Sequence, residues 1–344
     1  MGREREMLPD WLNNNILWEY DLPAEKATEV RGGFKIETAE GRKLVKLARS
    51  TPEAITLAYA ALLYLRERGF NQVAPIMLTK YGDPYLKIEH QAENQLYYLT
   101  EWVSGKECQL ERLPQLQEAV ATLSRMQAAA EGFFPPPTPS RERWHQWPAR
   151  YRQRIGELER CRELVEQGSV ASEFDTLFLT EVDGFIEQGY FSLEWLDEAG
   201  YPQLVEEARR SGGICHREFV GRNLIRTRRG EIFVVNFDNC QLDLRIFDLG
   251  RLLSRVLPRY SWDLELTVGL LDLYQEKKPL SAGELLVLIS YLNFPQRFWR
   301  LARRHYLEGV SEENEVRQLQ ELLLEQPVRE DFVLGFLRHY RLNR

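Results

Sequence analysis

Cysteine is scarce in this chain and is not arranged for cross-linking. The four cysteines lie far apart in the sequence and form no Cys-x-x-Cys pair. Such spacing suggests neither a disulfide framework nor a cysteine metal site, and it fits a reducing compartment. We expect Cys215 and Cys240 to be small, buried apolar side chains.

Long apolar runs and an excess of positive charge are also missing. Residues 1–11, MGREREMLPDW, contain no apolar core, which predicts that there is no signal peptide, and no run is long enough to span a membrane. The formal net charge of −7 disfavours nucleic acid or an anionic membrane as the main partner. These features together predict a cytoplasmic protein.

What the chain does have is enough apolar sequence for a full core. Apolar residues make up 44% of its 344 residues, and this length suits two domains or one two-lobed domain.

The first hundred residues predict a mixed lobe of strands and one helix. A hydroxyl at Thr51, then Pro52 and an acid, predict a helix over residues 52–68, which Gly69 ends. Short alternating runs predict strands over residues 27–31, 34–38, 43–47, 77–79, 85–89 and 96–101. The turn at residues 39–42 makes the second and third of these an antiparallel hairpin.

The remainder has mainly the pattern of helices. They are predicted over residues 116–130, 151–167, 173–188 and 194–210 and from residue 249 onward, with a proline-rich loop at 133–139. A strand-rich segment over residues 214–248 interrupts this pattern. We therefore predict an α+β fold with a small antiparallel lobe, residues 1–101, and a larger, mostly helical lobe, residues 102–344.

The segment 214–250 carries the most informative motif. His216 is followed by Glu218, by Asn223 five residues later, and by Asn236 after a predicted hairpin. Kinase-like phosphotransferases place an Asp base, an Asn five residues on and a metal-binding Asp after the hairpin at these spacings. The spacing predicts a two-lobed, protein-kinase-like fold, but Glu218 and Asn236 replace the two acids.

Two motif residues are the candidate catalytic residues. Glu218 is the candidate base, although its extra methylene moves the carboxylate by roughly 1 Å, which can cost on the order of 10²-fold in rate. The alternative is a surface acid beside Arg217 and Arg222. For His216 we favour a structural part in orienting the loop over a chemical one, because the motif contains no Ser or Cys nucleophile.

Asn223, Asn236 and Asp238 are the candidate Mg²⁺ ligands. Mg²⁺ prefers anionic oxygens, and both asparagines are neutral. On an extended strand Asp238 would share a face with Asn236 and could substitute for the missing acid; the alternative is a turn residue. We expect binding of ATP and Mg²⁺ to be weak or absent.

Lys46 lies on the strand before the predicted main helix and is the candidate phosphate-binding lysine. The alternative is an ordinary edge-strand lysine. The usual partner of such a lysine is an acid inside the following helix, yet that helix has acids only near its ends, at Glu53 and Glu67.

Two further features are each open to two interpretations, and a third, Asp248, has a structural one. Glu101 and Val103 lie where a hinge would present backbone groups to adenine, and the alternative is a plain linker. The pair Gly32-Gly33 would be a phosphate cover or a simple turn. Asp248 is predicted to tether the motif loop and to cap the next helix.

With these residues in view, the chain resembles the CotS-type spore coat proteins, which have an aminoglycoside phosphotransferase-like kinase fold. The likeness includes RGGFKIET at residues 31–38, LTEWVSGKEC at 99–108, residues 214–249, and YLNFPQRFW at 291–299. The resemblance implies a sporulation protein made in the mother cell and associated with the spore coat, with an ATP-binding fold. It also implies relatives that phosphorylate small hydroxylated molecules such as aminoglycosides and choline.

The leading hypothesis is a coat or sporulation protein with a degenerate phosphotransferase site and a binding or assembly role among other coat proteins. One alternative is an active ATP-dependent kinase of a small hydroxylated molecule with Glu218 as the base. Another is a carbohydrate-binding module. We expect residues 141–210 to hold contacts to an acceptor or to coat partners.

Overall fold

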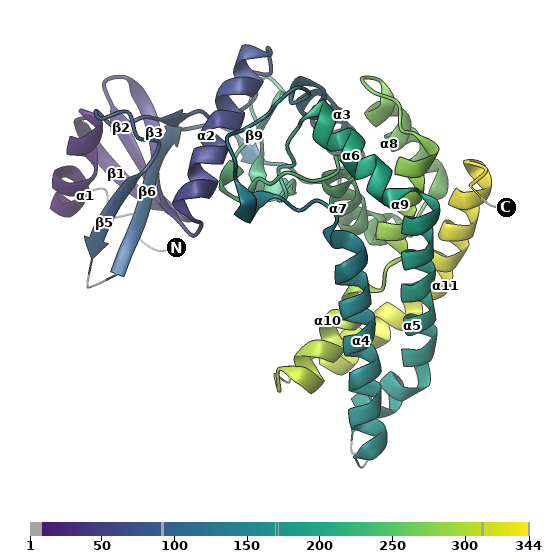
Figure 1. Ribbon diagram of the computed structural model, residues 1–344. Helices are drawn as coiled ribbons and strands as arrows, with labels where there is room; N and C mark the ends of the chain where they lie inside the picture. The colour runs from purple at the N-terminus through teal and green to yellow at the C-terminus, as the bar shows by residue number, and fades with distance from the viewer. Residues whose placement is uncertain (1–8, 91–92, 169, 171, 311–312, 343–344) are drawn as a thin grey trace. The chain divides into compact units, whose positions relative to one another are not determined.

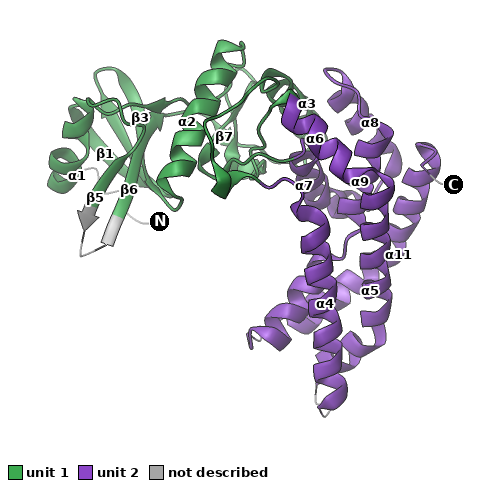
Figure 2. Cartoon of the chain, viewed as in Figure 1, with its two compact units in different colours: residues 1–142, 211–243 green, residues 143–210, 244–344 purple. Residues whose placement is uncertain are grey.

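The computed structural model describes residues 9–90, 93–168, 170, 172–310 and 313–342. The prediction on a signal peptide falls mostly on residues 1–8, outside the described residues. The chain forms two compact units (Figure 2): unit 1 holds residues 1–142 and 211–243, and unit 2 holds residues 143–210 and 244–344. The predicted lobe boundary after residue 101 stays a prediction.

Unit 1 is built on the antiparallel sheet that the sequence predicts. Its strands are β1 (Ala24–Val30), β2 (Gly33–Thr38), β3 (Gly41–Ala48), β4 (Ile76–Met77), β5 (Leu86–His90) and β6 (Glu93–Glu101). Their order is β1-β2-β3-β6-β4, and β5 also pairs with β6. All six were predicted, but β4 has only two residues.

One face of the sheet is covered by the N-terminal segment, whose helical turns were not predicted from the sequence. α1 (Asp10–Asn15) and the 3-10 turn η1 (Leu17–Tyr20) precede β1, and Figure 1 shows α1 against the sheet. A core cluster joins these turns to the strands through Leu12, Ile16, Leu17, Ile36, Val45 and Leu99, all fully buried. Burial of these side chains is the main stabilising term for the sheet.

The main helix of unit 1, α2 (Pro52–Glu67), has the predicted ends. The Thr51 hydroxyl accepts a hydrogen bond from the Ala54 N–H at 3.3 Å. Gly69 follows with φ of 85°, a left-handed conformation that stops the helix. α2 packs against the short turn η4 (Phe237–Asn239).

Strand pairing decides which way the lysines of β3 point. Lys46 lies opposite Tyr98 and Lys43 opposite Glu101 in the ladder between β3 and β6. Because side chains alternate along a strand, the pair Lys46–Tyr98 lies on the face opposite to Lys43–Glu101. The second pair forms a 2.6 Å ion pair in which Lys43 is buried.

The remaining part of unit 1 holds the motif segment. α3 (Leu113–Ala129) and a small sheet of β7 (Lys106–Glu107), β8 (Leu224–Arg226) and β9 (Ile232–Val234) surround it. The predicted hairpin is therefore present, as β8 and β9. The 3-10 turns η2 (Pro139–Arg141) and η3 (Gly221–Asn223) complete the unit.

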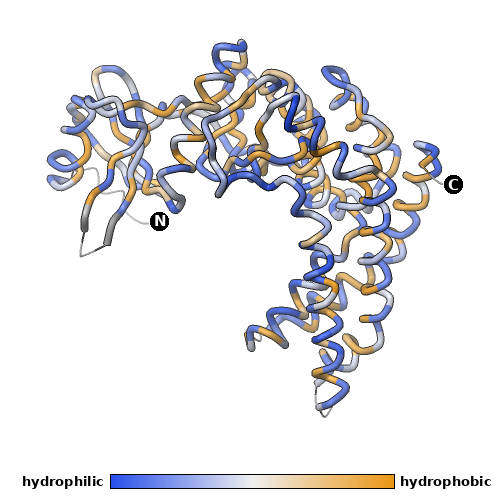
Figure 3. Tube along the Cα trace, in the orientation of Figure 1, coloured by the Kyte–Doolittle hydropathy of each residue, from blue (hydrophilic) through white to orange (hydrophobic). Residues whose placement is uncertain are grey.

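Unit 2 is helical. Its helices are α4 (Gln146–Gln167), α5 (Glu173–Glu198), α6 (Tyr201–Ser211), α7 (Ile246–Val256), α8 (Leu264–Gln275), α9 (Ala282–Asn293), α10 (Gln296–Ala302) and α11 (Glu315–His339), with short turns η5 (Leu257–Tyr260) and η6 (Arg303–Leu307). α4, α9 and α11 all pack against α5. Figure 3 shows hydrophobic and hydrophilic residues interleaved along these helices, as expected when one face is buried.

One helix boundary was predicted wrongly. The predicted helices over residues 173–188 and 194–210 place the break near residue 190, whereas α5 continues to Glu198 and α6 begins at Tyr201. Gly189 does not end the helix; a Cβ there would lie 2.9 Å from Ile155 Cγ1, so the glycine lets α4 and α5 approach closely. The break comes at Gly200, which has φ of 64°.

Two expectations from the sequence concern the cysteines and membrane-spanning segments. All four cysteines are free and buried, as expected for Cys215 and Cys240. No helix within the described residues has the length and apolar character needed to cross a membrane.

Gly33 offers a test of the sheet packing. A Cβ at Gly33 would lie 1.9 Å from the Val45 carbonyl oxygen, whereas one at Gly156 in α4 would meet nothing within 4 Å. We expect Gly33→Ala to lower the free energy of unfolding by about 1–3 kcal/mol, and the control Gly156→Ala to raise it by roughly 1 kcal/mol. Urea denaturation measures both; equal effects of the two substitutions would contradict this packing.

Candidate phosphotransferase site

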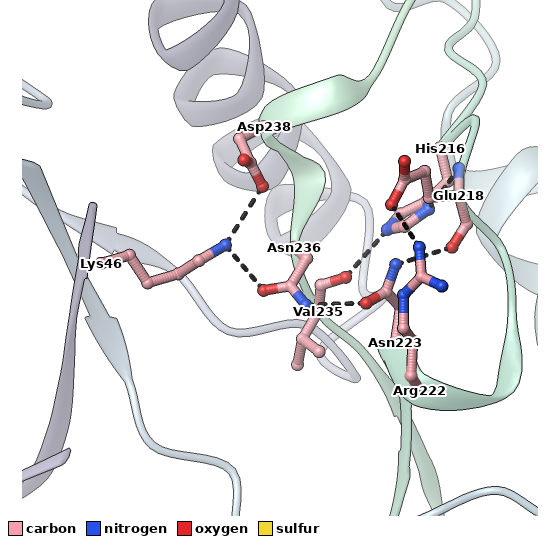
Figure 4. A network of polar contacts seen from close by, with 8 residues as sticks. All are labelled: Lys46, His216, Glu218, Arg222, Asn223, Val235, Asn236 and Asp238. Atoms are coloured by element: carbon pink, nitrogen blue, oxygen red, sulfur yellow. Dashed lines mark hydrogen bonds and ion pairs between the residues drawn. The ribbon is translucent and has the colours of Figure 1, made fainter. Parts of the chain in front are cut away.

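Lys46 is the centre of a polar network in unit 1. Its ammonium group donates to Asn236 Oδ1 at 2.7 Å and to Asp238 Oδ1 at 3.2 Å (Figure 4). The Lys46 and Asp238 side chains are only 12% and 13% exposed. The Tyr98 ring lies 5.0 Å from the ammonium group, so an aromatic face adds to its surroundings.

The carboxylate partner of Lys46 comes from η4 and not from α2. Glu53, the acid in the first turn of α2, accepts a hydrogen bond from the Ser140 hydroxyl instead. The residues of α2 that face inward are apolar. Asp238 thus takes the part of the helix acid that the sequence lacks.

Asp238 reaches Lys46 because the chain turns sharply after β9. Asn236 has φ of 68°, a left-handed conformation that starts the 3-10 turn η4. Of the two interpretations of Asp238, the strand face shared with Asn236 is wrong and the turn residue is right, because β9 ends at Val234 and Asp238 lies in η4. Asn tolerates the left-handed region better than most residues, and this turn places both side chains at the lysine.

A chain of hydrogen bonds continues from Asn236 to the motif loop. Asn236 Nδ2 donates to Asn223 Oδ1 at 2.7 Å, and Asn223 Nδ2 donates to the Glu218 carbonyl at 2.8 Å. The ammonium group of Lys46 can only donate, so it requires the Asn236 oxygen to face it. That orientation turns the Asn236 amide nitrogen toward Asn223 and so sets the orientation of both amides.

His216 holds the loop from within. It is fully buried; its Nε2 lies 2.9 Å from the Val235 carbonyl, and its Nδ1 accepts from the Glu218 N–H at 3.2 Å. These partners require the tautomer protonated at Nε2. Burial lowers the pKa of His216 to about 4, so the ring is neutral at pH 7. A neutral ring bonded on both nitrogens is an orienting group.

Glu218 lies at the surface of the site. Its carboxylate accepts from Arg222 Nη2 at 3.2 Å, and the side chain is 30% exposed. This contact is the one expected for a surface acid beside Arg222.

Asp238 is charged in this setting. Burial acts to raise its pKa, but the charge of Lys46 and its hydrogen bond lower the pKa overall. No group of three or more His, Cys, Asp or Glu among the described residues is arranged to hold a metal ion.

The predicted hinge at Glu101 and Val103 and the glycine pair Gly32-Gly33 also lie in unit 1. Glu101 pairs with Lys43, and its N–H lies 3.4 Å from the Pro75 carbonyl, while the Trp102 N–H donates to the Arg42 carbonyl. Val103 follows directly as part of the connection to β7. Gly32, with φ of 85°, makes the turn between β1 and β2.

Asp248 belongs to unit 2 and is fully buried in the first turn of α7. It is not the N-cap, which is Arg245, so that part of the prediction is wrong. Tyr98 and the Lys43–Glu101 pair were not predicted from the sequence. The alternation of strands β3 and β6 was the signal available for both, but it needed the ladder register.

Comparison with known families agrees with this geometry. Residues 29–279 match the family of phosphotransferase enzymes, which is more than half of the chain. The chain belongs to the phosphotransferase enzyme family. The predicted kinase-like fold, with an antiparallel sheet followed by a mainly helical part, is confirmed.

This phosphotransferase-family chain is also similar to a coat protein and to solved kinases. It is 29% identical over 278 residues to spore coat protein S of Bacillus subtilis strain 168, covering 80% of this chain and 77% of that protein, which confirms the predicted resemblance. An aminoglycoside phosphotransferase from Alicyclobacillus acidocaldarius matches with a TM-score of 0.82 and 20% identity, covering 98% and 97% of the two chains. A spectinomycin phosphotransferase in complex with ADP and spectinomycin has a TM-score of 0.61 and 13% identity, with coverage of 96% and 98%.

His216 predicts a dependence of stability on pH. Its folded pKa of about 4 lies below the ordinary value of 6.5, so the unfolded chain binds a proton that the folded chain does not. Stability from this group is therefore complete above pH 6.5 and is lost as the pH falls toward 4, by about 3 kcal/mol in all. Urea denaturation across this range should show the slope in the parent and not in His216→Gln. The exposed control His339→Gln should retain it; a slope that persists in His216→Gln would contradict the assignment.

The Lys46–Asp238 pair should be strongly coupled. Removing one partner leaves a nearly buried charge, so Asp238→Asn should lower the free energy of unfolding by about 3 kcal/mol. Lys46→Met combined with Asp238→Asn should cost less than the sum of the two single changes. In the exposed pair Arg317–Glu321 the same cycle should give a coupling of no more than about 0.5 kcal/mol. Equal couplings at both pairs would refute the role given to Lys46.

Proposed function

We propose that this protein is a spore coat component whose phosphotransferase site has lost efficient catalysis and whose role is binding or assembly in the coat. Its coat association is supported by the similarity to spore coat protein S. The loss of catalysis is supported by one observation above all: Asn236 donates to Asn223 while accepting from Lys46. Both amides at the metal positions are thereby bonded within the chain.

The residues present do not fit a catalytic magnesium ion. Mg²⁺ in phosphotransferases is held by one or two carboxylates together with the phosphates. Asn223 Oδ1 and Asn236 Oδ1 are neutral, and each already accepts a hydrogen bond. Asp238 is the carboxylate that contacts Lys46, and its charge is balanced by that lysine.

The hydrogen bonds of Lys46 in this network also oppose the binding of ATP. A phosphate-binding lysine must present its ammonium group to the α- and β-phosphates. Lys46 instead donates to Asn236 and Asp238. A nucleotide would have to replace these contacts in a nearly buried place, so we propose that ATP binds weakly or not at all.

A second candidate function is slow transfer to a small hydroxylated molecule with Glu218 as the base. The observation in its favour is that the Glu218 carboxylate is partly exposed and, among the described residues, contacts only Arg222, which is itself exposed. The side chain is therefore able to reorient toward an acceptor. The longer side chain and the missing metal acid would each lower the rate by on the order of 10²-fold.

Radiolabelled ATP separates the two candidates. Incubated with Mg²⁺, coat extract and a panel of sugars and amino alcohols, the parent should transfer phosphate at no more than about 10⁻² s⁻¹. The double variant Glu218→Asp, Asn236→Asp should be faster, and only variants with Asp at 236 should show stabilisation by ATP that depends on Mg²⁺. Asn239→Asp adds the same charge in the same turn and is the matched control. Brisk transfer by the parent that Glu218→Gln abolishes would establish the second candidate and overturn the first.

The location of the protein in the cell tests the coat assignment, and its choice between sugars and ATP tests the carbohydrate-binding alternative. A fluorescent fusion expressed in sporulating cells should collect at the coat, and Lys46→Met and Glu218→Gln should leave that location unchanged. A signal that stays in the mother cell cytoplasm would overturn the coat assignment. Thermal stabilisation by sugars but not by ATP would instead favour a carbohydrate-binding module.

A further inference from the structure

Helix α11 in unit 2 carries apolar side chains on its outer face. Its inner face is buried against α5, α8, α9 and α10. On the outer face Leu324 is 80% exposed, which makes it the most exposed large apolar side chain within the described residues. Val328, one turn later, is 45% exposed, and Pro327 beside it is also exposed. The packing of unit 2 itself does not account for apolar side chains at these positions.

Two opposite charges lie at equal distances from Leu324 along this face. Arg317 comes seven residues before it and Asp331 seven residues after it. Seven residues are close to two helical turns, or about 10 Å of axis, so all three residues lie on one face. The Arg317 side chain is 80% exposed, and Asp331 is also exposed. We call this row of Arg317, Leu324, Pro327, Val328 and Asp331 the outer stripe of α11.

The outer stripe is complementary to itself when two copies of α11 lie antiparallel. If Leu324 of each copy lies on a two-fold axis, Arg317 of one copy comes opposite Asp331 of the other, and the same happens at the other end. A symmetric dimer uses the same patch on both subunits and needs a match of this kind. A parallel pair in register would place like charges opposite each other, so the charges favour the antiparallel arrangement.

The contact that Arg317 already makes is compatible with this pairing. Its Nε donates to Glu321 Oε1 at 2.9 Å, four residues later on the same helix. The two side chains are 80% and 53% exposed, and such exposed pairs are weak. A guanidinium group has five N–H donors, so Arg317 can bond a second carboxylate without giving up the first.

We propose that a second copy of this chain covers the outer stripe, so that two α11 helices pack antiparallel about Leu324 in a symmetric dimer. Leu324 of each copy lies against that of the other, Pro327 and Val328 pack beside it, and two Arg317–Asp331 ion pairs close the ends. One helix face offers less area than the about 800 Å² per partner of a stable dimer. We therefore expect association at high protein concentration, such as that within a coat. This contact goes beyond the function proposed above, and its failure would leave that proposal standing.

Disulfide cross-linking tests the position of the two-fold axis. The four native cysteines are buried, so Leu324→Cys introduces an accessible thiol. Mild oxidation of the full chain should join two copies through this thiol, because each lies against its counterpart. The matched control Leu164→Cys, at a position of α4 that is 45% exposed, should give few dimers. A Leu324→Cys product in coat extract that joins the chain to a different protein, with no homodimer, would overturn the proposal.

Charge reversal tests the ion pairs at the ends. In sedimentation equilibrium the average mass of the parent should rise with concentration toward twice the mass of one chain. Arg317→Glu and Asp331→Arg should each weaken the dimer by about tenfold, because each places like charges opposite at both ends. The double variant Arg317→Glu, Asp331→Arg should recover the affinity of the parent. A mixture of the two single variants should form a heterodimer in preference to either homodimer.

A matched charge reversal elsewhere makes the outcome decisive. Arg228→Glu makes the same change at an exposed position between β8 and β9, and it should dimerise as the parent does. Circular dichroism establishes that each variant is folded, and if a charge variant does not fold, the Leu324→Cys cross-link carries the test. A parent that stays monomeric at every concentration, equal weakening by Arg228→Glu and Arg317→Glu, or a mixture without heterodimer would overturn the proposal.

Discussion

The ammonium group of Lys46 is the constraint on which the site depends. It is nearly buried, it can only donate, and it therefore requires oxygen atoms around it. Asn236 and Asp238 supply them, and the Asn236 amide orients Asn223, which in turn holds the Glu218 carbonyl. One charge placed by the register of β3 thus organises a loop almost two hundred residues later in the chain.

His216 completes this arrangement from the opposite side. It bonds the Val235 carbonyl just before Asn236 and the Glu218 N–H within the loop. The two segments that carry the motif are therefore joined twice, once through a neutral imidazole and once through a pair of amides. Both connections are hydrogen bonds between groups of the chain itself.

The parts that sequence could predict are those with local causes. The strands and α2 follow from alternation, the Thr51 cap and Gly69, and the motif follows from its spacing. The partner of Lys46 was not predictable in this way, because it depends on a left-handed residue at Asn236 that curls Asp238 back. The cover of α1 and η1 was missed since so short a helix has little periodicity. The division between α5 and α6 was predicted too early in the chain: Gly189 lies within α5 and permits close packing, while Gly200 makes the turn.

The amide at position 236 also has a genetic consequence. Asparagine and aspartate side chains have nearly the same size and shape, and their codons differ by a single base. The fold therefore presents no steric barrier to exchange at this position in either direction. What separates the two states is how the charge of Lys46 is shared and whether position 236 can donate to Asn223, so a lineage with this scaffold can gain or lose an acid there in one mutational step.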